Sequence, residues 1–365
     1  MSGKINIVNF FCSYAFRLIG DGDDVLKAGK EIKILFVYSV LPSFIRRDLE
    51  ILERHFSVKS MKIATFLVPR RGRDPLVFLK LFKGILWADI AFSWFADLNA
   101  FFIVLFCTIL RKKFVVVVGG YDVVYVPEID YGDLKSWWGR VRVKFVLEHA
   151  TKVLPFSDYA KDRVSSITRK ANIQVIQLAC DIEKFKATSR RKENLVITVC
   201  YVSRENIKRK GLETFVKSAC FLSNAKFALI GAHGDESIEC LKSMSPSNVE
   251  FPGYVSSEEL IKWYQRAKVY CQLSYEEGFG VALIEAMACG CVPVVSLKAK
   301  ALRDTVGECG FYIPYGDVEA TSDAIKKALT APPDLGLKAR EHVRSLFSIT
   351  EREKKLSESI YDVSA

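Results

Sequence analysis

The amino-acid sequence predicts an α/β protein made of two doubly wound, Rossmann-like domains that face a central cleft. The chain has 365 residues, which is enough for two domains with a hydrophobic core each. Short apolar segments alternate with helical ones along most of its length, as is typical of parallel sheets covered on both faces. At residues 269–295 a strand, a glycine turn, a helix and a second strand follow one another, and this order indicates a βαβ crossover.

The first half predicts one parallel sheet with its helices. We expect strands at 32–37, 58–63, 90–95, 114–118, 152–156 and 173–178, and helices at 48–55, 76–86, 100–110, 136–149 and after Ser157. The valine run that ends at Val118 shows no alternation, so it predicts a strand buried on both faces. Gly119, Gly120, Tyr121 and Asp122 follow at the carboxyl end of this strand, where ligands bind in α/β folds. A tight turn alone also explains the two glycines.

A charged linker separates this half from a second series of strands and helices. Residues 181–194 have the composition of a domain linker. We therefore expect a peripheral extension at 1–30, an N-terminal domain at 31–188, a C-terminal domain at 189–345 and a tail helix at 346–365. Within the second domain we expect strands at 195–199, 227–230, 269–273 and 292–295, and helices at 212–221, 256–267 and 317–329.

Composition narrows the classes of partner. The formal net charge of +11 suits substrate phosphates, an anionic membrane surface or nucleic acid. The usual nucleic-acid motifs are absent from the sequence, so phosphates and membrane lead and no nucleic-acid partner is expected. The ten cysteines form no Cys-x-x-Cys pair, so we expect no metal site and a reduced, cytoplasmic protein. No apolar run reaches the roughly 18–20 residues that span a bilayer.

The most informative stretch is the turn and helix between the last two strands of the crossover. Gly278 and Gly280 allow a ligand to approach the backbone, and the free amides of the helix that follows offer an anion site. Glu277 lies at the turn, and Glu285 follows about two helical turns later. Carboxylates accept hydrogen bonds from hydroxyls, so the pair suits a nucleotide sugar. The alternative is an ordinary glycine turn whose glutamate favours the helix dipole.

The string from Glu277 to Val295 resembles a known signature. Glu-Gly-Phe-Gly, then Glu-Ala-Met-Ala-x-Gly-x-Pro-Val-Val, is similar to the motif of the family 4 retaining glycosyltransferases, also called glycosyltransferases group 1, which have the GT-B fold. The resemblance covers about residues 32–365, weakly in the first half and strongly in the second. It implies metal-independent, retaining transfer of a hexose-type sugar from a nucleotide diphosphate to a hydroxyl acceptor. No cofactor is implied besides this donor.

The resemblance also implies roles for residues of the second domain. Arg204 and Lys210 match the arginine and lysine that hold the donor diphosphate, although Lys208 or Arg209 could take the role of Lys210. A solvated basic loop is the alternative for this segment. The same family pattern implies that Glu277 holds the sugar hydroxyls, Glu285 the ribose, the turn residues Gly278, Phe279, Gly280 and Val281 the diphosphate, and the backbone near Tyr254 and Val255 the nucleobase.

The first domain departs from the family pattern at two places. Relatives often have His-Gly-x-Asp after the valine strand, and this chain has Gly119 in the histidine slot. No histidine role is carried over, whereas Gly120 and Asp122 match and are expected at the substrate. The glycine-rich loop that follows the first strand in relatives is missing. Arg46 or Arg47 could supply positive charge in its place, and the alternative is that the two arginines belong to a solvated helix start.

The expected partners follow from this resemblance and from the charge. They are a nucleotide sugar, a glycan or lipid-linked acceptor, and an anionic membrane surface at which a cytoplasmic protein would be peripheral. The acidic and aromatic loop 125–132 is expected to form a wall of the acceptor site, and the tail helix to cross back to the first domain, as in relatives. A nucleotide-sugar-binding protein without transfer activity is the alternative, supported by Gly119. The base, sugar, acceptor and linkage stay open.

Overall fold

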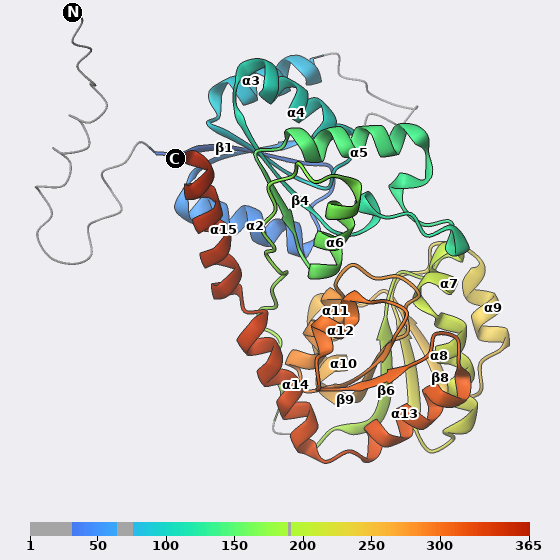
Figure 1. Cartoon of the computed structure of the whole chain (residues 1–365). Coiled ribbons are helices and arrows are strands. Elements are labelled where there is room, and N and C mark those ends of the chain that lie inside the picture. Colours follow the sequence, from blue (N-terminus) through green and yellow to red (C-terminus); the bar gives the residue numbers. More distant parts are fainter. Residues whose placement is uncertain (1–30, 64–75, 189–190) are drawn as a thin grey trace, which may run out of the picture.

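The computed structural model describes residues 31–63, 76–188 and 191–365. The expected N-terminal extension lies outside the described residues. Two parallel sheets lie one above the other, each with its own helices (Figure 1).

The first sheet has the strand order β2-β1-β3-β4-β5, and every neighbouring pair is parallel. Its strands are β1 Lys33–Tyr38, β2 Ser57–Lys62, β3 Ile90–Trp94, β4 Lys113–Val118 and β5 Lys152–Pro155. Its helices are α2 Ser43–His55, α3 Val77–Trp87, α4 Leu98–Leu110, α5 Trp137–His149 and α6 Asp158–Ile167, with short 3-10 turns η2 Tyr121–Val123, η3 Pro127–Ile129 and η4 Asp133–Lys135 between β4 and α5.

Strand β4 shows why the valine run lacks alternation. Val115 and Val117 pack in the core that α2 and the C-terminal helix cover, while Val116 and Val118 pack in the core beneath α3, α4 and α5. Both faces of the strand are therefore buried, as the sequence predicted.

The second sheet has the order β11-β10-β9-β6-β7-β8 and is also parallel. Its strands are β6 Glu193–Val199, β7 Lys226–Ile230, β8 Val249–Gly253, β9 Ala267–Gln272, β10 Val292–Ser296 and β11 Phe311–Ile313. Its helices are α7 Arg204–Lys210, α8 Leu212–Ser218, α9 Ser237–Ser243, α10 Ser257–Arg266, α11 Val281–Ala288, α12 Ala301–Val306, α13 Val318–Thr330 and α14 Pro333–Leu346, with the 3-10 turn η5 Ala219–Phe221 after α8.

The last helix, α15 (Ile349–Ser364), returns to the first domain and packs beside α2 (Figure 1). Arg352 of α15 donates to both carboxylate oxygens of Asp48 at 2.6 and 2.7 Å, and to the carbonyls of Ile176 and Gln177. Both charged side chains are almost fully buried. Removing either partner would leave the other charge buried without a counterion, so this pair holds α15 on the first domain.

Three segments differ from the sequence-based predictions. Residues 173–178 form only an isolated bridge, Ile173 to Val153, because the chain leaves the sheet there to enter the interdomain connection. The basic segment 204–210 is helix α7 rather than a loop, and Gly211 ends it in the left-handed conformation with φ 63°. Helix α14 lies between the expected helix at 317–329 and the tail helix, where the sequence analysis placed no element; Pro333 is well suited to its first helical position.

Candidate active site

A buried ion pair occupies the carboxyl edge of the second sheet. The carboxylate of Glu277 accepts hydrogen bonds from the Lys210 ammonium and, at 2.9 Å, from the side-chain amide of Gln272. Gly211 makes this pairing possible, because a Cβ there would lie 2.3 Å from the carbonyl oxygen of Leu273. Only glycine therefore lets the end of α7 approach the end of β9 closely enough for Lys210 to reach the turn.

The surroundings keep Glu277 ionised. Burial raises the pKa of its carboxyl, but the charges of Lys210 and Arg209 and the hydrogen bonds from Lys210 and Gln272 outweigh burial, so the pKa lies below the ordinary value. An ionised carboxylate is purely a hydrogen-bond acceptor. Glu277 can therefore bind hydroxyl groups of a ligand while Lys210 offers a cation beside it.

The other basic residues of α7 point to different places. Arg204 is exposed at the first residue of the helix, and its backbone amide donates to Asp235 at 2.9 Å. The Arg209 guanidinium lies 5.0 Å from the ring centre of Tyr131 in the first domain. Lys208 is exposed, and its carbonyl accepts a hydrogen bond from Tyr315. Of the three candidates, Lys210 is thus the one paired with Glu277, and Arg209 links the two domains.

The glycine turn touches the first domain directly. Ser157, at the N-cap of α6, donates to the carbonyl of Gly278 at 2.9 Å. A Cβ on Gly278 would lie 2.3 Å from the carbonyl oxygen of Gly119. Gly280, with φ 97°, is the N-cap of α11, so the free amides of that helix begin at Val281. The turn predicted to bind the donor therefore also forms an interdomain contact.

Asp122 holds the loop of the first domain that contains Gly119 and Gly120. Its buried carboxylate accepts the backbone amides of Ala96, Gly119 and Gly120 at 3.1, 3.3 and 3.0 Å. Burial raises its pKa above the ordinary value, and these amides oppose the rise. The sequence placed Asp122 at the substrate. Its carboxylate is instead turned inward and occupied, so we assign it the positioning of Gly120, which remains at the surface of the loop.

A second carboxylate lies on α11. Tyr264 of α10 donates to Glu285 at 3.4 Å, and burial raises the pKa of Glu285 to about 7, while the charges of Arg47 and Lys184 lower it. Helix α10 begins just after Tyr254 and Val255; Val255 packs on the same core as Tyr264, and Tyr254 is 80% exposed. Helix α10 thus follows the segment expected to bind the base and contacts Glu285, the residue expected to bind the ribose.

Comparison with known proteins identifies this domain. Residues 196–331 match the profile of the family described as "Glycosyl transferases group 1". The second domain is a group 1 glycosyl transferase domain. The O-antigen chain mannosyltransferase B of Escherichia coli is 38% identical over 81 residues, which cover 22% of this chain and 21% of that protein. The capsular polysaccharide biosynthesis glycosyltransferase CapM of Staphylococcus aureus is 27% identical over 232 residues, 56% of this chain and 60% of that protein. These alignments thus span between about one fifth and three fifths of the curated relatives.

Solved structures match nearly the whole chain. The sucrose-phosphate synthase of Thermosynechococcus elongatus has a TM-score of 0.72 at 19% identity, over 91% of this chain and 99% of that one. Anabaena HepE, solved in complex with UDP and glucose, also has a TM-score of 0.72, at 16% identity, over 91% of this chain and 100% of that one. The glycosyl transferase domain and its partner domain therefore form the GT-B fold that the sequence predicted.

The structure adds residues that sequence reasoning did not place at the site. Arg47 of α2 donates to the carbonyl of Ala179, and its charge acts on Glu285 of the glycosyl transferase domain. The sequence left Arg46 and Arg47 undecided; Arg47 is the one near this carboxylate. Glu276 is buried beside Tyr159, and burial raises its pKa. The distance in sequence between these partners concealed both contacts.

Proposed function

We propose that this protein is a retaining, metal-independent glycosyltransferase that moves a hexose-type sugar from a nucleotide diphosphate to a hydroxyl acceptor. The observation that carries the proposal is the Lys210–Glu277 pair at the glycine turn that opens α11, within the glycosyl transferase domain. The pair offers a cation and a hydrogen-bond acceptor side by side, as a donor with a diphosphate and several hydroxyls requires.

The reaction breaks the bond between the anomeric carbon and the diphosphate oxygen. The acceptor hydroxyl forms the new bond and releases its proton, while negative charge grows on the departing diphosphate. Lys210, Arg204 and the free amides at Phe279–Val281 would stabilise this charge, because preorganised cations and amides lower the barrier where charge develops. These residues would supply the stabilisation for which other transferases use a metal ion.

The carboxylates would orient the donor. Ionised Glu277 would accept hydrogen bonds from sugar hydroxyls, and Glu285 from the ribose. The backbone near Tyr254 and Val255 would receive the base, next to α10 and its contact with Glu285. Gly120 would line the opposite side of the sugar.

Nucleotide release tests the proposal. We would incubate the full chain with UDP-glucose or GDP-mannose in the presence of a chelator, because Anabaena HepE has been solved in complex with UDP-glucose and a similar protein of Xanthomonas campestris is a GDP-mannose-dependent mannosyltransferase. We expect release of the nucleoside diphosphate from at least one donor and, with an acceptor, a product with the donor's anomeric configuration by NMR. A protein that neither binds nor cleaves any donor of a nucleotide-sugar panel would contradict the proposal.

A nucleotide-sugar-binding protein without transfer activity is the second candidate, and Gly119 favours it. A side chain at this position would meet the Phe156 ring at 2.8 Å, so a histidine does not fit here without movement. Saturable donor binding without release of the nucleotide, over a panel of acceptors, would support this candidate over transfer.

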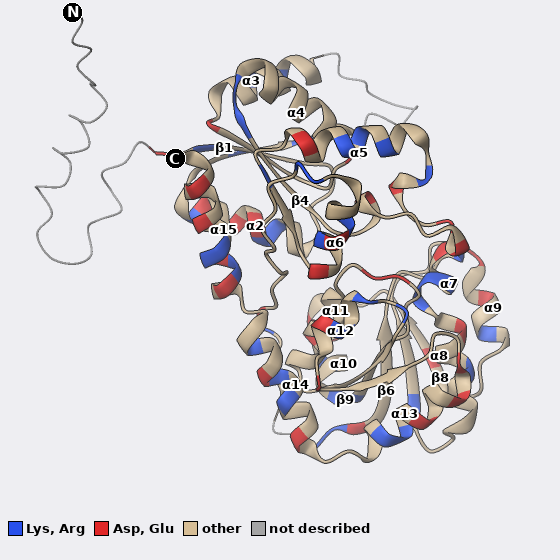
Figure 2. Ribbon diagram, in the orientation of Figure 1, with Lys and Arg blue, Asp and Glu red and all other residues tan. Residues whose placement is uncertain are grey.

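We also infer a peripheral contact with anionic membrane at the cytoplasmic face. In the described part of the chain, no helix is both long and apolar enough to span a bilayer. The described helices α3 and α4 contain no Asp or Glu. Ile109, Trp137, Trp138 and Val141 are exposed on α4 and α5, and α5 also presents basic side chains (Figure 2). Interfacial tryptophans beside basic groups suit a lipid headgroup region.

Liposome co-sedimentation tests this contact. We expect the wild type to bind vesicles that contain phosphatidylglycerol and to dissociate at high salt, since surface charges are then screened. Trp137→Ser/Trp138→Ser should weaken binding severalfold, whereas Phe221→Ser, which removes an exposed aromatic of the other domain, should not. Binding that ignores both salt and lipid charge would contradict the inference.

A further inference from the structure

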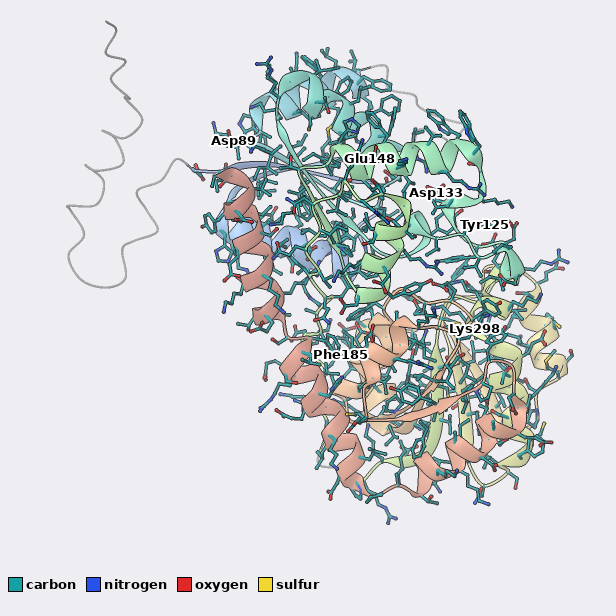
Figure 3. The ribbon with its side chains drawn as sticks, viewed as in Figure 1. Asp89, Tyr125, Asp133, Glu148, Phe185 and Lys298 are labelled. Atoms are coloured by element: carbon teal, nitrogen blue, oxygen red, sulfur yellow. The ribbon has the colours of Figure 1, made fainter. Side chains whose placement is uncertain are left out.

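A cavity of about 280 Å³ lies between the carboxyl edges of the two sheets. The four segments that line it follow β4, β5, β9 and β10, so each comes after the carboxyl end of a strand. Figure 3 shows Tyr125 of the first domain and Lys298 of the second on the two sides of this cavity. Ligands of doubly wound domains bind at such edges, so a group held by one domain can meet a group held by the other here.

Two acidic side chains in the described part of the chain line this cavity, and they differ in exposure. Glu128 is exposed, whereas Glu276 is only 8% exposed. Glu276 immediately precedes Glu277, the residue that we expect to hold the sugar of the donor. A buried carboxylate that borders both the sugar site and the cavity is placed to contact a hydroxyl group that enters the cavity.

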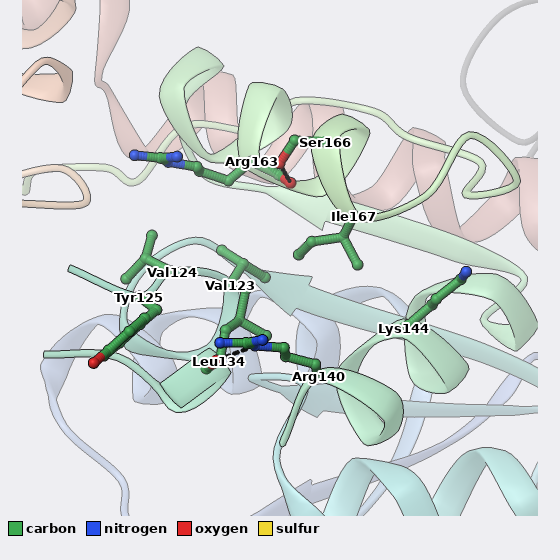
Figure 4. A pocket seen from close by; sticks show the side chains of 9 residues that line it. All are labelled: Val123, Val124, Tyr125, Leu134, Arg140, Lys144, Arg163, Ser166 and Ile167. Carbon is green, nitrogen blue, oxygen red and sulfur yellow. Dashed lines mark hydrogen bonds between the residues drawn. The ribbon is translucent and has the colours of Figure 1, made fainter. Parts of the chain in front are cut away.

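Helix α6 orients the Glu276 carboxylate from the first domain. Arg163 donates from Nε to the Tyr159 hydroxyl at 3.0 Å, and its guanidinium lies 5.1 Å from the centre of the Tyr159 ring. Since that hydroxyl accepts from Arg163, its own hydrogen is available for the side-chain hydrogen bond that it forms with Glu276. Arg163 also lines a second cavity, of about 370 Å³, between the loops after β4 and helices α5 and α6, and its guanidinium points away from Lys144 there (Figure 4).

The surroundings make Glu276 a stronger base than its neighbour Glu277. Burial raises the pKa of Glu276 above the ordinary value, although the hydrogen bond from Tyr159 opposes the rise. The pKa of Glu277 lies below the ordinary value, because Lys210 and Arg209 stabilise its ionised form. The titratable and charged groups that act on Glu276 are Tyr159 and Arg163 of α6, Arg209 of α7, the adjacent Glu277, Tyr131 of the loop after β4 and Lys298 of the loop after β10.

We propose that Glu276 takes the proton of the attacking hydroxyl group during transfer, and that Tyr159 and Arg163 position its carboxylate. The oxygen–hydrogen bond of the acceptor breaks, and its proton moves to a carboxylate oxygen of Glu276. The acceptor oxygen forms the bond to the anomeric carbon, and the electron pair of the bond that breaks leaves with the diphosphate. Glu276 then returns the proton to water in the cavity. The inference rests on the proposed transferase function and adds the group that receives the proton.

The pH dependence of nucleotide release by the full chain tests the inference, with water as the acceptor. The substrate is the donor of the nucleotide-sugar panel that the wild type cleaves, with UDP-glucose and GDP-mannose tried first. At saturating donor, turnover should fall as the pH is lowered through the pKa of Glu276, because only the ionised carboxylate takes a proton. Saturation separates this acidic limb from the titration of Glu285, which we expect to change nucleotide affinity. Glu276→Gln should remove the limb and lower turnover at neutral pH about a hundredfold, the lower end of what positioned bases contribute.

A second variant tests the positioning role of Tyr159. Tyr159→Phe removes the hydrogen bond that lowers the pKa of Glu276, so the acidic limb should move to higher pH while turnover on its alkaline side stays near the wild-type value. A purely structural role would lower turnover without moving the limb. The matched control is Glu128→Gln, which makes the same change on the exposed acid of the same cavity and should keep the wild-type rate and pH profile.

Calorimetric titration with UDP and GDP separates a role in proton transfer from one in donor binding. Glu276→Gln should bind the nucleotide as tightly as the wild type does, and a loss of this affinity would overturn the inference. If the wild type cleaves a donor but Glu276→Gln keeps its rate and its acidic limb, or Tyr159→Phe leaves the limb in place, the role of Glu276 is wrong and the proposed function stands. If the wild type cleaves no donor of the panel, both the role of Glu276 and the proposed function fail.

Discussion

The two domains share a parallel sheet with helices on both faces, but the carboxyl edges of their sheets carry different chemistry. In the glycosyl transferase domain this edge presents a cation and an ionised carboxylate, Lys210 and Glu277. In the first domain the corresponding edge presents glycine backbone, and its carboxylate, Asp122, is turned inward to hold three amides. The edge of the second sheet presents charged side chains, and the edge of the first sheet presents backbone.

Under the proposed function, this difference indicates that the two domains would determine donor and acceptor specificity in different ways. In the glycosyl transferase domain, the proposed donor half, Glu277 lies at the turn before α11 and Glu285 within α11, so a compact motif can describe both carboxylates, while Lys210 reaches Glu277 from α7. The first domain, the proposed acceptor half, distributes its polar groups over the loops after β4 and over α5 and α6, around two cavities that share Tyr125 and Arg163. The second kind of site can change its ligand through many independent substitutions without disturbing the sheet.

The largest effect should come from breaking the ion pair of the donor half. Glu277→Gln keeps the shape and the hydrogen bond from Gln272 within reach but removes the charge that Lys210 and the sugar hydroxyls use. We expect turnover to fall about 10- to 150-fold, the equivalent of one charged hydrogen bond of about 1.5–3 kcal/mol. Steady-state release of nucleoside diphosphate measures it.

Lys210→Met completes a double-mutant cycle with Glu277→Gln. Because the two residues form one unit, the double variant should be less impaired than the product of the single losses. Strict multiplicativity of the two effects would show that the residues act independently and would contradict the pairing.

A somewhat smaller effect should come from the contact between the two edges. Gly278→Ala places a Cβ 2.3 Å from the carbonyl oxygen of Gly119, so the glycine turn must move away from the first domain. We expect transfer to slow at least tenfold, because misplacement of about 1 Å can cost about a hundredfold. The radius of gyration by small-angle X-ray scattering should rise.

Gly120→Ala is the matched control for the scattering measurement. A Cβ at Gly120 lies 3.9 Å from Phe156, an ordinary contact, so the interdomain arrangement should stay as in the wild type. Indistinguishable rates and radii in Gly278→Ala and the wild type would show that this close approach has no role.

The fold and the donor turn could be predicted because both depend on local sequence. Alternating apolar segments specify parallel strands, and the Glu277–Val295 string lies within one βαβ unit. The isolated bridge at Ile173 and the helix at α14 were missed, since tertiary contacts decide whether an apolar or proline-started segment becomes a strand or a helix.

The remaining parts of the site depend on contacts between distant segments. Arg209 meets Tyr131 and the charge of Arg47 reaches Glu285 only after the two domains are assembled. The cavity beside α5 combines side chains from three regions, and no spacing in the sequence links Val123 with Arg140 or Arg163. The sequence indicated an acceptor wall at 125–132 but not the charge of the pocket behind it.

A pH profile of nucleotide binding would test the role of Glu285, the second carboxylate of the glycosyl transferase domain. The pKa of Glu285 is about 7, so the side chain ionises between pH 6 and 8 and then accepts stronger hydrogen bonds from ribose. We expect nucleotide affinity to rise about fivefold over this range, equivalent to about 1 kcal/mol. Calorimetric titration should show a flat profile for Glu285→Gln.

The raised pKa of Glu285 also predicts that stability changes with pH in the opposite direction to nucleotide affinity. Its folded-state value of about 7 lies above the ordinary 4.5, so the folded state holds the proton more tightly and this group's contribution falls as pH rises from about 4.5 to 7. Relative to Glu285→Gln, the wild type should therefore lose free energy of unfolding in urea over this window. A relative gain would contradict the burial of this carboxyl.

The smallest effect should come from Ser157, where one hydroxyl serves both domains. It accepts the amide of Ala160 as the N-cap of α6 and donates to the carbonyl of Gly278. Ser136 is the matched control, because its hydroxyl caps α5 of the same domain by accepting the amide of Gly139, a hydrogen bond that stays within that domain. Ser136→Ala should lower the free energy of unfolding by about 1 kcal/mol, and Ser157→Ala by about 2 kcal/mol. Equal losses in urea denaturation would mean that the interdomain hydrogen bond adds nothing, and that the two edges are held together by the close packing of Gly119 on Gly278 alone.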